Sequence, residues 1–313
     1  MRKTAEARAQ NFKARLPQIT ADMHCDTLTL SAPFWGHIKL REMTAQNFQC
    51  FAAFTEDEKA AAYAAAKSLF YRTFSGDKFA PVSNYGGLVA AWRTGKIPCA
   101  LTCENIGFTG GTPQHIRQLR GDGVIMASLV WNVENVLAYP NVRADGLREG
   151  RGLKEPGRQA VAALDENKII VDISHLSDGG VEDILTNRKI PAVASHSCCN
   201  GVHNNPRNLT DSQLKLIADC GGAGGVNFYK KFLGGRGDWG QIAAHIKHII
   251  KVAGEDTPAF GSDWDGVPQG EIAVYPRTMP QLLQFLADEG ISQSVLDKLA
   301  YKNFLRVFKE VCG

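Results

Sequence analysis

Residues 169–207 constrain the fold of this chain more than any other stretch. Two short apolar runs in it, Ile169–Ile173 and Ala192–Ala194, have the composition of buried strands. Each run is followed by a serine and then by a histidine, His175 in the first case and His196 in the second. A single histidine at a strand end is more often structural than functional, but two in consecutive units favour a metal site.

The segment between these runs is typical of a helix over Asp178–Asn187, with Ser177 or Asp178 as its N-cap. A strand, a helix and a second strand of this length form a βαβ unit with parallel strands. Both imidazoles are then expected at the carboxyl edge of the sheet, where α/β folds place their chemistry.

The remaining chain repeats this alternation and predicts a (β/α)8 barrel as a single domain of residues 1–313. Further strands are expected at 19–21, leading into 22–26, and at 49–54, 97–104, 124–130, 221–229 and 259–266. Helices are expected at about 56–74, 88–94, 157–167, 211–219, 239–252, 279–289 and 292–311. In the helix over 239–252, His245 and His248 are expected to be partly exposed and without a role in the site.

Composition limits the classes of protein to which this chain can belong. A 44% hydrophobic and 21% charged chain is expected to fold, and a net charge of +3 does not favour nucleic acid or a membrane surface as a partner. No apolar run approaches the length of a bilayer span, and residues 1–18 are expected to form a polar helical extension and not a signal peptide. We therefore expect a cytoplasmic protein whose eight cysteines are reduced.

Carboxylates join the histidines at other expected strand ends. If residues 22–26 are extended as a strand, His24 and Asp26 share a face and lie about 7 Å apart, which suits a cation such as Zn²⁺. Glu104 ends the third strand, and its position fits a solvated helix residue as well as a metal bridge. Asp263 begins Asp-Trp-Asp-Gly, which lacks the rest of a calcium loop and is better interpreted as a catalytic carboxylate at a strand end. Together, three histidines and three carboxylates suffice for two divalent cations about 3.5–4 Å apart.

The order of these motifs resembles the membrane dipeptidase (renal dipeptidase) family of zinc metallopeptidases, from about residue 20 to the C-terminus. The similar segments are DMHCD at 22–26, CEN at 103–105, VDISHLS at 171–177, VASHS at 193–197, NPRNLTD at 205–211, GGVNFY at 224–229, FGSDWDGVP at 260–268 and NFLRVF at 303–308. No single segment is specific, but the set is.

The resemblance implies roles for individual residues. His24 and Asp26 would hold one zinc, His175 and His196 the other, and Glu104 would bridge both, together with a water or hydroxide.

The same resemblance implies a substrate-binding set and a proton carrier. Arg207 would bind the C-terminal carboxylate of the substrate, or else be a solvated loop arginine, and Asp263 would transfer a proton from the water to the leaving amine. Asn227 and Tyr229 would line the pocket.

One position departs from the family. Its mammalian members carry a histidine after the fourth strand, in a segment that reads Leu129-Val130-Trp131-Asn132 here. Trp131 can stack and donate one N–H, and Asn132 can donate to an oxyanion, but neither is an imidazole. Substrate range is therefore the property that this change puts in question.

The leading hypothesis is a zinc-dependent dipeptidase that cleaves dipeptides with a free C-terminal carboxylate. A second hypothesis keeps the binuclear site but assigns another small amide, an N-acyl amino acid or a lactam, as substrate. A third is a catalytically silent metal-binding barrel, which predicts a lost ligand. The resemblance also favours a homodimer.

Overall fold

The computed structural model describes residues 16–29, 36–44, 46–56 and 59–313. The helical extension expected over residues 1–18 lies outside the described residues, apart from 16–18, which are not helical.

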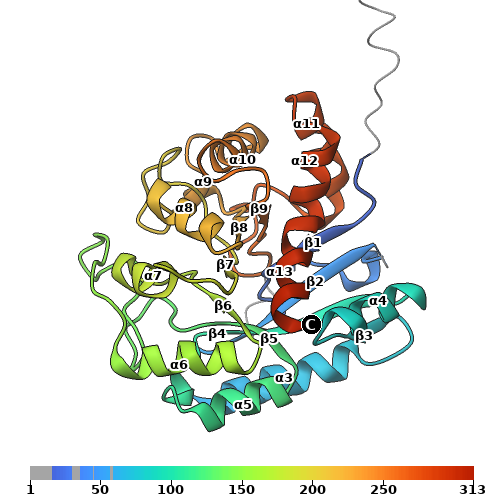
Figure 1. Cartoon of the computed structure of the whole chain (residues 1–313). Helices are drawn as coiled ribbons and strands as arrows, with labels where there is room; N and C mark the ends of the chain where they lie inside the picture. Colours follow the sequence, from blue (N-terminus) through green and yellow to red (C-terminus); the bar gives the residue numbers. More distant parts are fainter. Residues whose placement is uncertain (1–15, 30–35, 45, 57–58) are drawn as a thin grey trace, which may run out of the picture.

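Within the described residues, eight parallel strands close into a barrel surrounded by helices, as predicted (Figure 1). The ring runs β2-β1-β9-β8-β7-β6-β5-β4 and closes because β2 pairs with β4 as well as with β1. A ninth short strand, β3, extends the sheet beside the start of β4. The strands are β1 Thr20–Asp22, β2 Asn47–Phe54, β3 Phe79–Pro81, β4 Ile97–Glu104, β5 Val124–Ser128, β6 Ile170–Asp172, β7 Ala192–Ala194, β8 Ala223–Val226 and β9 Pro258–Phe260.

Each of the eight barrel strands overlaps an apolar run that predicted it, because strands covered by helices are buried on both faces. Several are shorter or displaced: β8 occupies only part of the predicted 221–229, and β9 shares only residues 259–260 with the predicted 259–266. Every residue of β4 and β5 is buried, for example. The strand β3 was not predicted. It has three half-buried residues, of which Pro81 cannot donate to a ladder, so it lacks the pattern of a barrel strand.

Most cover helices agree with the predicted ones within a few residues at each end. The helix predicted over 292–311 is instead divided by a π-helical turn at Lys298–Lys302, and the short helix Lys230–Leu233 was not predicted. Ser177 caps α7 by accepting the backbone N–H of Gly180, and Thr210 caps α8 within a capping box. The α-helices are α3 Ala60–Phe74, α4 Tyr85–Arg93, α5 Pro113–Gly121, α6 Glu155–Glu166, α7 Asp178–Leu185, α8 Asp211–Asp219, α9 Lys230–Leu233, α10 Trp239–Ala253, α11 Met279–Asp288, α12 Gln293–Asp297 and α13 Asn303–Cys312. Shorter turns are η1 Leu40–Glu42, η2 Gly107–Thr109, η3 Pro276–Thr278 and the π-helical turn η4 Lys298–Lys302.

The C-terminal helix α13 closes the amino-terminal end of the barrel, where it crosses close to the strands (Figure 1). Its Phe304 and Phe308 rings lie 5.7 Å and 5.4 Å from the ring of Phe48 at the start of β2. All three rings are buried. With this end filled by aromatic side chains, the opposite end of the barrel is left for a site.

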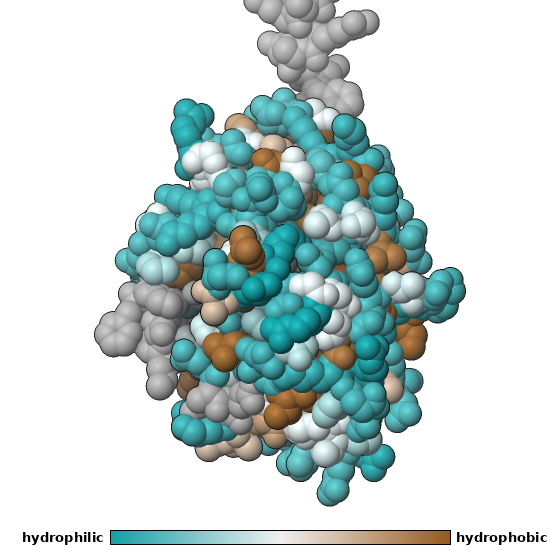
Figure 2. Space-filling view, turned by 90° about the vertical axis from the view of Figure 1, so that its left-hand side faces the viewer, coloured by the Kyte–Doolittle hydropathy of each residue, from teal (hydrophilic) through white to brown (hydrophobic). Residues whose placement is uncertain are grey.

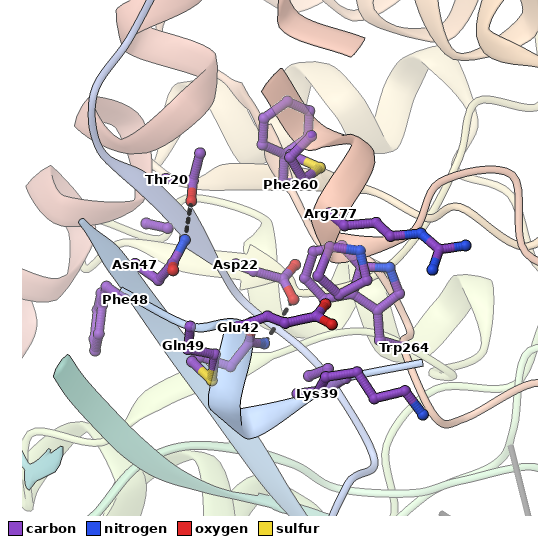
Figure 3. A pocket seen from close by; sticks show the side chains of 15 residues that line it. Thr20, Asp22, Lys39, Glu42, Asn47, Phe48, Gln49, Phe260, Trp264 and Arg277 are labelled. Atoms are coloured by element: carbon purple, nitrogen blue, oxygen red, sulfur yellow. Dashed lines mark hydrogen bonds between the residues drawn. The ribbon is translucent and has the colours of Figure 1, made fainter. Parts of the chain in front are cut away.

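A buried carboxylate fixes the first strand beside a small cavity on the barrel flank (Figure 3). Asp22 accepts hydrogen bonds from Gln49 Nε2 at 2.6 Å, from Ser262 Oγ at 2.6 Å and from Ser262 N at 2.7 Å. Burial raises the pKa of Asp22 to about 6, while these donors favour its ionised form. The residue thereby ties β1 to β2 and to the segment that follows β9.

The face of the molecule drawn in Figure 2 is mostly hydrophilic, with hydrophobic residues in small separate groups. No helix among the described residues is both long and apolar enough to span a bilayer.

Candidate metal centre

The six predicted metal-site and catalytic residues all lie at the carboxyl end of the barrel. Glu104 is the last residue of β4, and the others directly follow the ends of strands β1, β6, β7 and β9. Each is at most 8% exposed. They are His24, Asp26, Glu104, His175, His196 and Asp263.

Two groups of ligand atoms meet at the Glu104 carboxylate. On one side, His24 Nε2 lies 3.7 Å from Glu104 Oε2 and 3.3 Å from Asp26 Oδ2. On the other side, Glu104 Oε1 lies 2.9 Å from His175 Nε2 and 3.7 Å from His196 Nε2. Glu104 thus presents one oxygen to each group, which is the arrangement of a carboxylate that bridges two cations.

Local backbone geometry contributes to this convergence. His175 and Asp263 adopt positive φ values of 68° and 62°, a region that is uncommon for residues other than glycine. The rings of His24 and His196 stack with centroids 3.8 Å apart. Such outliers persist where the surrounding structure enforces them, and they concentrate at functional sites.

The electrostatics of the cluster call for added positive charge. Burial alone lowers the pKa of His24, but the carboxylates of Asp26 and Glu104 raise it to about 10. Burial, together with the neighbouring Asp26 carboxylate, raises the pKa of Glu104 well above its usual range. Without a cation, His24 and Glu104 therefore hold protons that offset the negative charge of the buried carboxylates.

The residues fit a pair of divalent cations. Burial lowers the pKa values of His175 and His196 well below the usual range, so both imidazoles are neutral, as a metal ligand must be. Asp26 Oδ1 is buried and has no hydrogen-bond partner. Among the described residues, three sets of ligand atoms lie within 4.8 Å of one another: Glu104 with His175 and His196, Glu104 with His24 and Asp26, and Asp263 with His24 and His196. Imidazole nitrogen and carboxylate oxygen suit zinc.

Asp263 lies beside the cluster and is held by Asn227, which follows β8. Asn227 Nδ2 donates to Asp263 Oδ2 at 2.9 Å, and both side chains are buried. Burial raises the pKa of Asp263 above its usual value. A carboxyl group of this kind can accept and release a proton near neutral pH more readily than a solvated aspartate.

Arg207 is buried in the same pocket and is not a solvated loop residue, being 5% exposed. Its Nη1 donates to Ser197 Oγ at 2.9 Å, whereas Nε and Nη2 have no partner. A buried guanidinium with two free donors is costly unless an anion completes it. The unused donors form a fork suited to a carboxylate.

The pocket over the cluster encloses about 320 Å³ and brings the remaining predicted residues together. Trp131 packs edge-on against Phe54, with ring centroids 4.8 Å apart, and its ring lies 6.3 Å from that of His175. Tyr229 lines the same pocket, whereas Asn227 does not line it and contacts two residues that do, Asp263 and the backbone N–H of Tyr229. Asn132 lines the pocket too, but its Oδ1 lies 2.9 Å from His175 Nδ1, a contact that the sequence did not indicate.

Asp172 and Ser195 are further polar residues of the site that the sequence analysis missed. Asp172 ends β6 and accepts the backbone N–H and the hydroxyl of Ser195, while Ser195 Oγ contacts His196 Nδ1. The available signal was an aspartate at the end of an otherwise apolar strand.

Comparisons with known proteins agree with this geometry. The family model described as membrane dipeptidase (peptidase family M19) matches residues 21–312. An uncharacterized protein in the pqqA 5' region of Klebsiella pneumoniae is 34% identical over 216 residues, 66% of this chain and 80% of its own length. An uncharacterized dipeptidase of Schizosaccharomyces pombe is 34% identical over 222 residues, which cover 68% of this chain and only 53% of that protein. This chain therefore spans about half the length of the yeast relative.

Solved structures share the fold at lower identity. A metallopeptidase named dipeptidase AC has a TM-score of 0.80 and 22% identity, over 94% of this chain and 99% of that one. A metallopeptidase of Rhodobacter sphaeroides, liganded with a phosphinate mimic of the dipeptide L-Ala-D-Ala, has a TM-score of 0.79 and 22% identity over the same shares. The family match across nearly the whole chain confirms the resemblance seen in the sequence: the chain belongs to the membrane dipeptidase family, peptidase family M19, and is a metal-dependent peptidase.

Proposed function

We propose that this chain is a zinc-dependent dipeptidase that hydrolyses dipeptides with a free C-terminal carboxylate. The observation that carries the proposal is one pocket that contains both a buried set of metal-ligand atoms and the free donors of Arg207. That a related metallopeptidase was solved with a dipeptide mimic supports the substrate class.

In this proposal two zinc ions share the site. His24 and Asp26 would hold one, His175 and His196 would hold the other, and Glu104, whose two oxygens face the two groups, would contribute to both. When bound, such a pair would lower the pKa of a coordinated water and would polarise the carbonyl oxygen of the peptide bond.

The protein's own residues orient the substrate and move the proton. Arg207 would bind the C-terminal carboxylate through Nε and Nη2, which fixes the peptide bond one residue away over the cluster. Asp263 would take a proton from the attacking water and deliver it to the nitrogen of the leaving amino acid as the C–N bond breaks. Asn227 would keep the Asp263 carboxylate turned toward the cluster.

The walls of the pocket limit the size of the substrate. About 320 Å³ lies at the lower end of the range of small-molecule pockets, which suits a dipeptide and excludes a folded chain. Trp131 and Phe54 form an apolar wall, so the position that is histidine in mammalian members would contribute contact area here. Among the residues that line the pocket, Trp131, Asn132 and Tyr229 carry side-chain donors that could serve an oxyanion.

Metal content measured by mass spectrometry, together with hydrolysis assays, tests the proposal. The purified chain is expected to hold about two zinc ions, to lose dipeptide hydrolysis on chelation and to regain it with zinc. The substrate panel would contain dipeptides, the matching N-acyl amino acids and a lactam.

The panel separates the proposal from its alternatives. N-acyl amino acids carry the same carboxylate for Arg207, so their hydrolysis without that of any dipeptide would transfer the function to another small amide. Zinc binding without turnover of any of these substrates would indicate a silent barrel. If the chain bound no zinc when excess zinc was supplied without chelator, the metal site itself would be contradicted.

A further inference from the structure

We propose that Asn132 and the Ser195–Asp172 pair are positioning residues that fix the tautomers of His175 and His196, so that both Nε2 atoms face the metal site. This inference rests on the proposed function, in which the two histidines are metal ligands. It assigns to three residues a role that neither the sequence motifs nor the family match supplies.

The contact of Asn132 determines which nitrogen of His175 carries hydrogen. Asn132 Oδ1 lies 2.9 Å from His175 Nδ1. An amide oxygen only accepts, so the hydrogen of the neutral ring must be on Nδ1 and the lone pair on Nε2. That nitrogen lies 2.9 Å from Glu104 Oε1, inside the candidate metal cluster.

Two linked hydrogen bonds, from Asp172 through Ser195, fix the position of the ring hydrogen of His196. Ser195 Oγ lies 2.5 Å from Asp172 Oδ2 and 2.7 Å from His196 Nδ1. The hydroxyl has one hydrogen, which goes to the carboxylate because an ionised carboxylate only accepts. Ser195 Oγ must then accept from His196 Nδ1–H, which again leaves the lone pair on Nε2.

The orienting residues are themselves held rigidly. Asp172 Oδ1 accepts the backbone N–H groups of Ser174 and Ser195, each at 2.9 Å, so both carboxylate oxygens are engaged. Asp172, Ser174 and Ser195 are all at most 5% exposed. Partners of this kind behind a metal-ligating histidine typically change metal affinity by 10–100-fold when removed.

The first measurement uses the unaltered full chain without metal. Nitrogen NMR of histidine-labelled protein is expected to show both His175 and His196 with hydrogen on Nδ1. Hydrogen on Nε2 of both rings would overturn the inference. Because no variant is needed, this test does not depend on any substitution being tolerated.

The second measurement is zinc affinity by competition with a chelator. Asn132→Leu and Ser195→Ala are each expected to weaken zinc binding by about 10–100-fold. Asn132→Asp keeps an acceptor and is expected to stay near the affinity of the unaltered chain. Thr102→Ala is the matched control for the serine, because it removes a buried hydroxyl in β4 that has no hydrogen-bond partner.

The outcomes separate this inference from the proposed function. If the unaltered chain binds zinc and both variants bind it equally well, the positioning role is wrong and the dipeptidase proposal stands. If the weakened variants recover hydrolysis in excess zinc, the residues act through the metal and not through substrate contact. A chain that binds no zinc overturns both.

Discussion

The Nε2 atoms of His175 and His196 lie 2.9 Å apart, on loops that follow two adjacent strands of the barrel. The two Nδ1 atoms have other partners, Asn132 and Ser195, so the facing nitrogens both present lone pairs. Two lone pairs repel unless a cation lies between them. Tetrahedral zinc with Zn–N bonds of about 2.0–2.1 Å separates two imidazole nitrogens by about 3.3 Å, close to the separation found here.

Asp263→Asn is expected to abolish proton transfer while leaving the fold and the metal in place. Asparagine tolerates the positive φ of 62° at this position, and its amide oxygen can still accept from Asn227 Nδ2. We expect kcat to fall by about 10²–10⁴-fold, the usual contribution of a general acid–base residue.

Metal content is the control for this variant. Asp263 also lies within one of the three possible ligand sets, with His24 and His196. Zinc content unchanged with activity lost supports the proton carrier, whereas loss of one zinc would make Asp263 a ligand. Activity that survives would reject both roles.

Arg207→Lys tests recognition of the substrate carboxylate. Lysine keeps the charge but loses the fork formed by Nε and Nη2. Hydrogen bonds to charged groups contribute about 1.5–3 kcal/mol, so kcat/KM for a dipeptide is expected to fall by roughly ten- to a hundredfold.

A substrate without the carboxylate is the matched control for Arg207. The C-terminal amide of the same dipeptide should be a poor substrate for the unaltered enzyme, and the lysine variant should discriminate much less between the acid and the amide. Equal discrimination by both enzymes would show that Arg207 does not bind the carboxylate.

The amino-acid pattern predicts the barrel because each strand is a separate apolar run, and it predicts the strand-end residues because a closed parallel barrel brings them to one edge. The second layer of the site follows no such pattern. Asn132 contacts His175 between two loops, and Asp172, at the end of β6, contacts Ser195 in the segment after β7. Which partner each one meets depends on loop conformation, not on spacing in the sequence.

The prediction that His245 is partly exposed was wrong for a related reason. Periodicity places it on α10 but does not reveal that the loop after β7 covers that face. In the structure it is fully buried, with Nδ1 accepting from Cys199 N at 3.0 Å and Nε2 lying 3.1 Å from Leu233 O. The helix was predicted, whereas what packs against it required the tertiary structure.

Gly261→Ala is expected to destabilise the barrel directly beneath the site. A Cβ at Gly261 would lie 1.6 Å from Ser195 O, a backbone atom of the segment that carries His196. The backbone would have to shift, at a cost of about 1–3 kcal/mol in the free energy of unfolding.

Gly224→Ala in β8 is the matched control, because a Cβ there meets no atom within 4 Å. Thermal unfolding of both variants is the measurement. A Gly261 variant as stable as the Gly224 variant would mean that the close approach of Gly261 to the Ser195 carbonyl is not constrained as described. Zinc affinity of the Gly261 variant should also fall, since the shift displaces His196.

His245 gives the apoprotein a pH-dependent term in its stability. Burial lowers the pKa of His245 to about 4. The neutral ring also has a partner at each nitrogen, and a second hydrogen on Nδ1 would face the Cys199 N–H. With an unfolded pKa of about 6.5, the unfolded chain binds this proton first as the pH falls. The contribution is therefore fully present above about pH 6.5 and is lost as the pH drops toward 4, with an upper limit of about 3 kcal/mol.

His245→Gln keeps a donor for Leu233 O and cannot titrate. We compare the unfolding free energies of the unaltered chain and this variant without metal from pH 7 to pH 4. As the pH falls, the unaltered chain is expected to lose stability relative to the glutamine variant. Because the metal-site histidines titrate equally in both proteins, their contributions cancel in this difference. A difference that stays constant across the range would show that His245 is not held neutral in the folded chain.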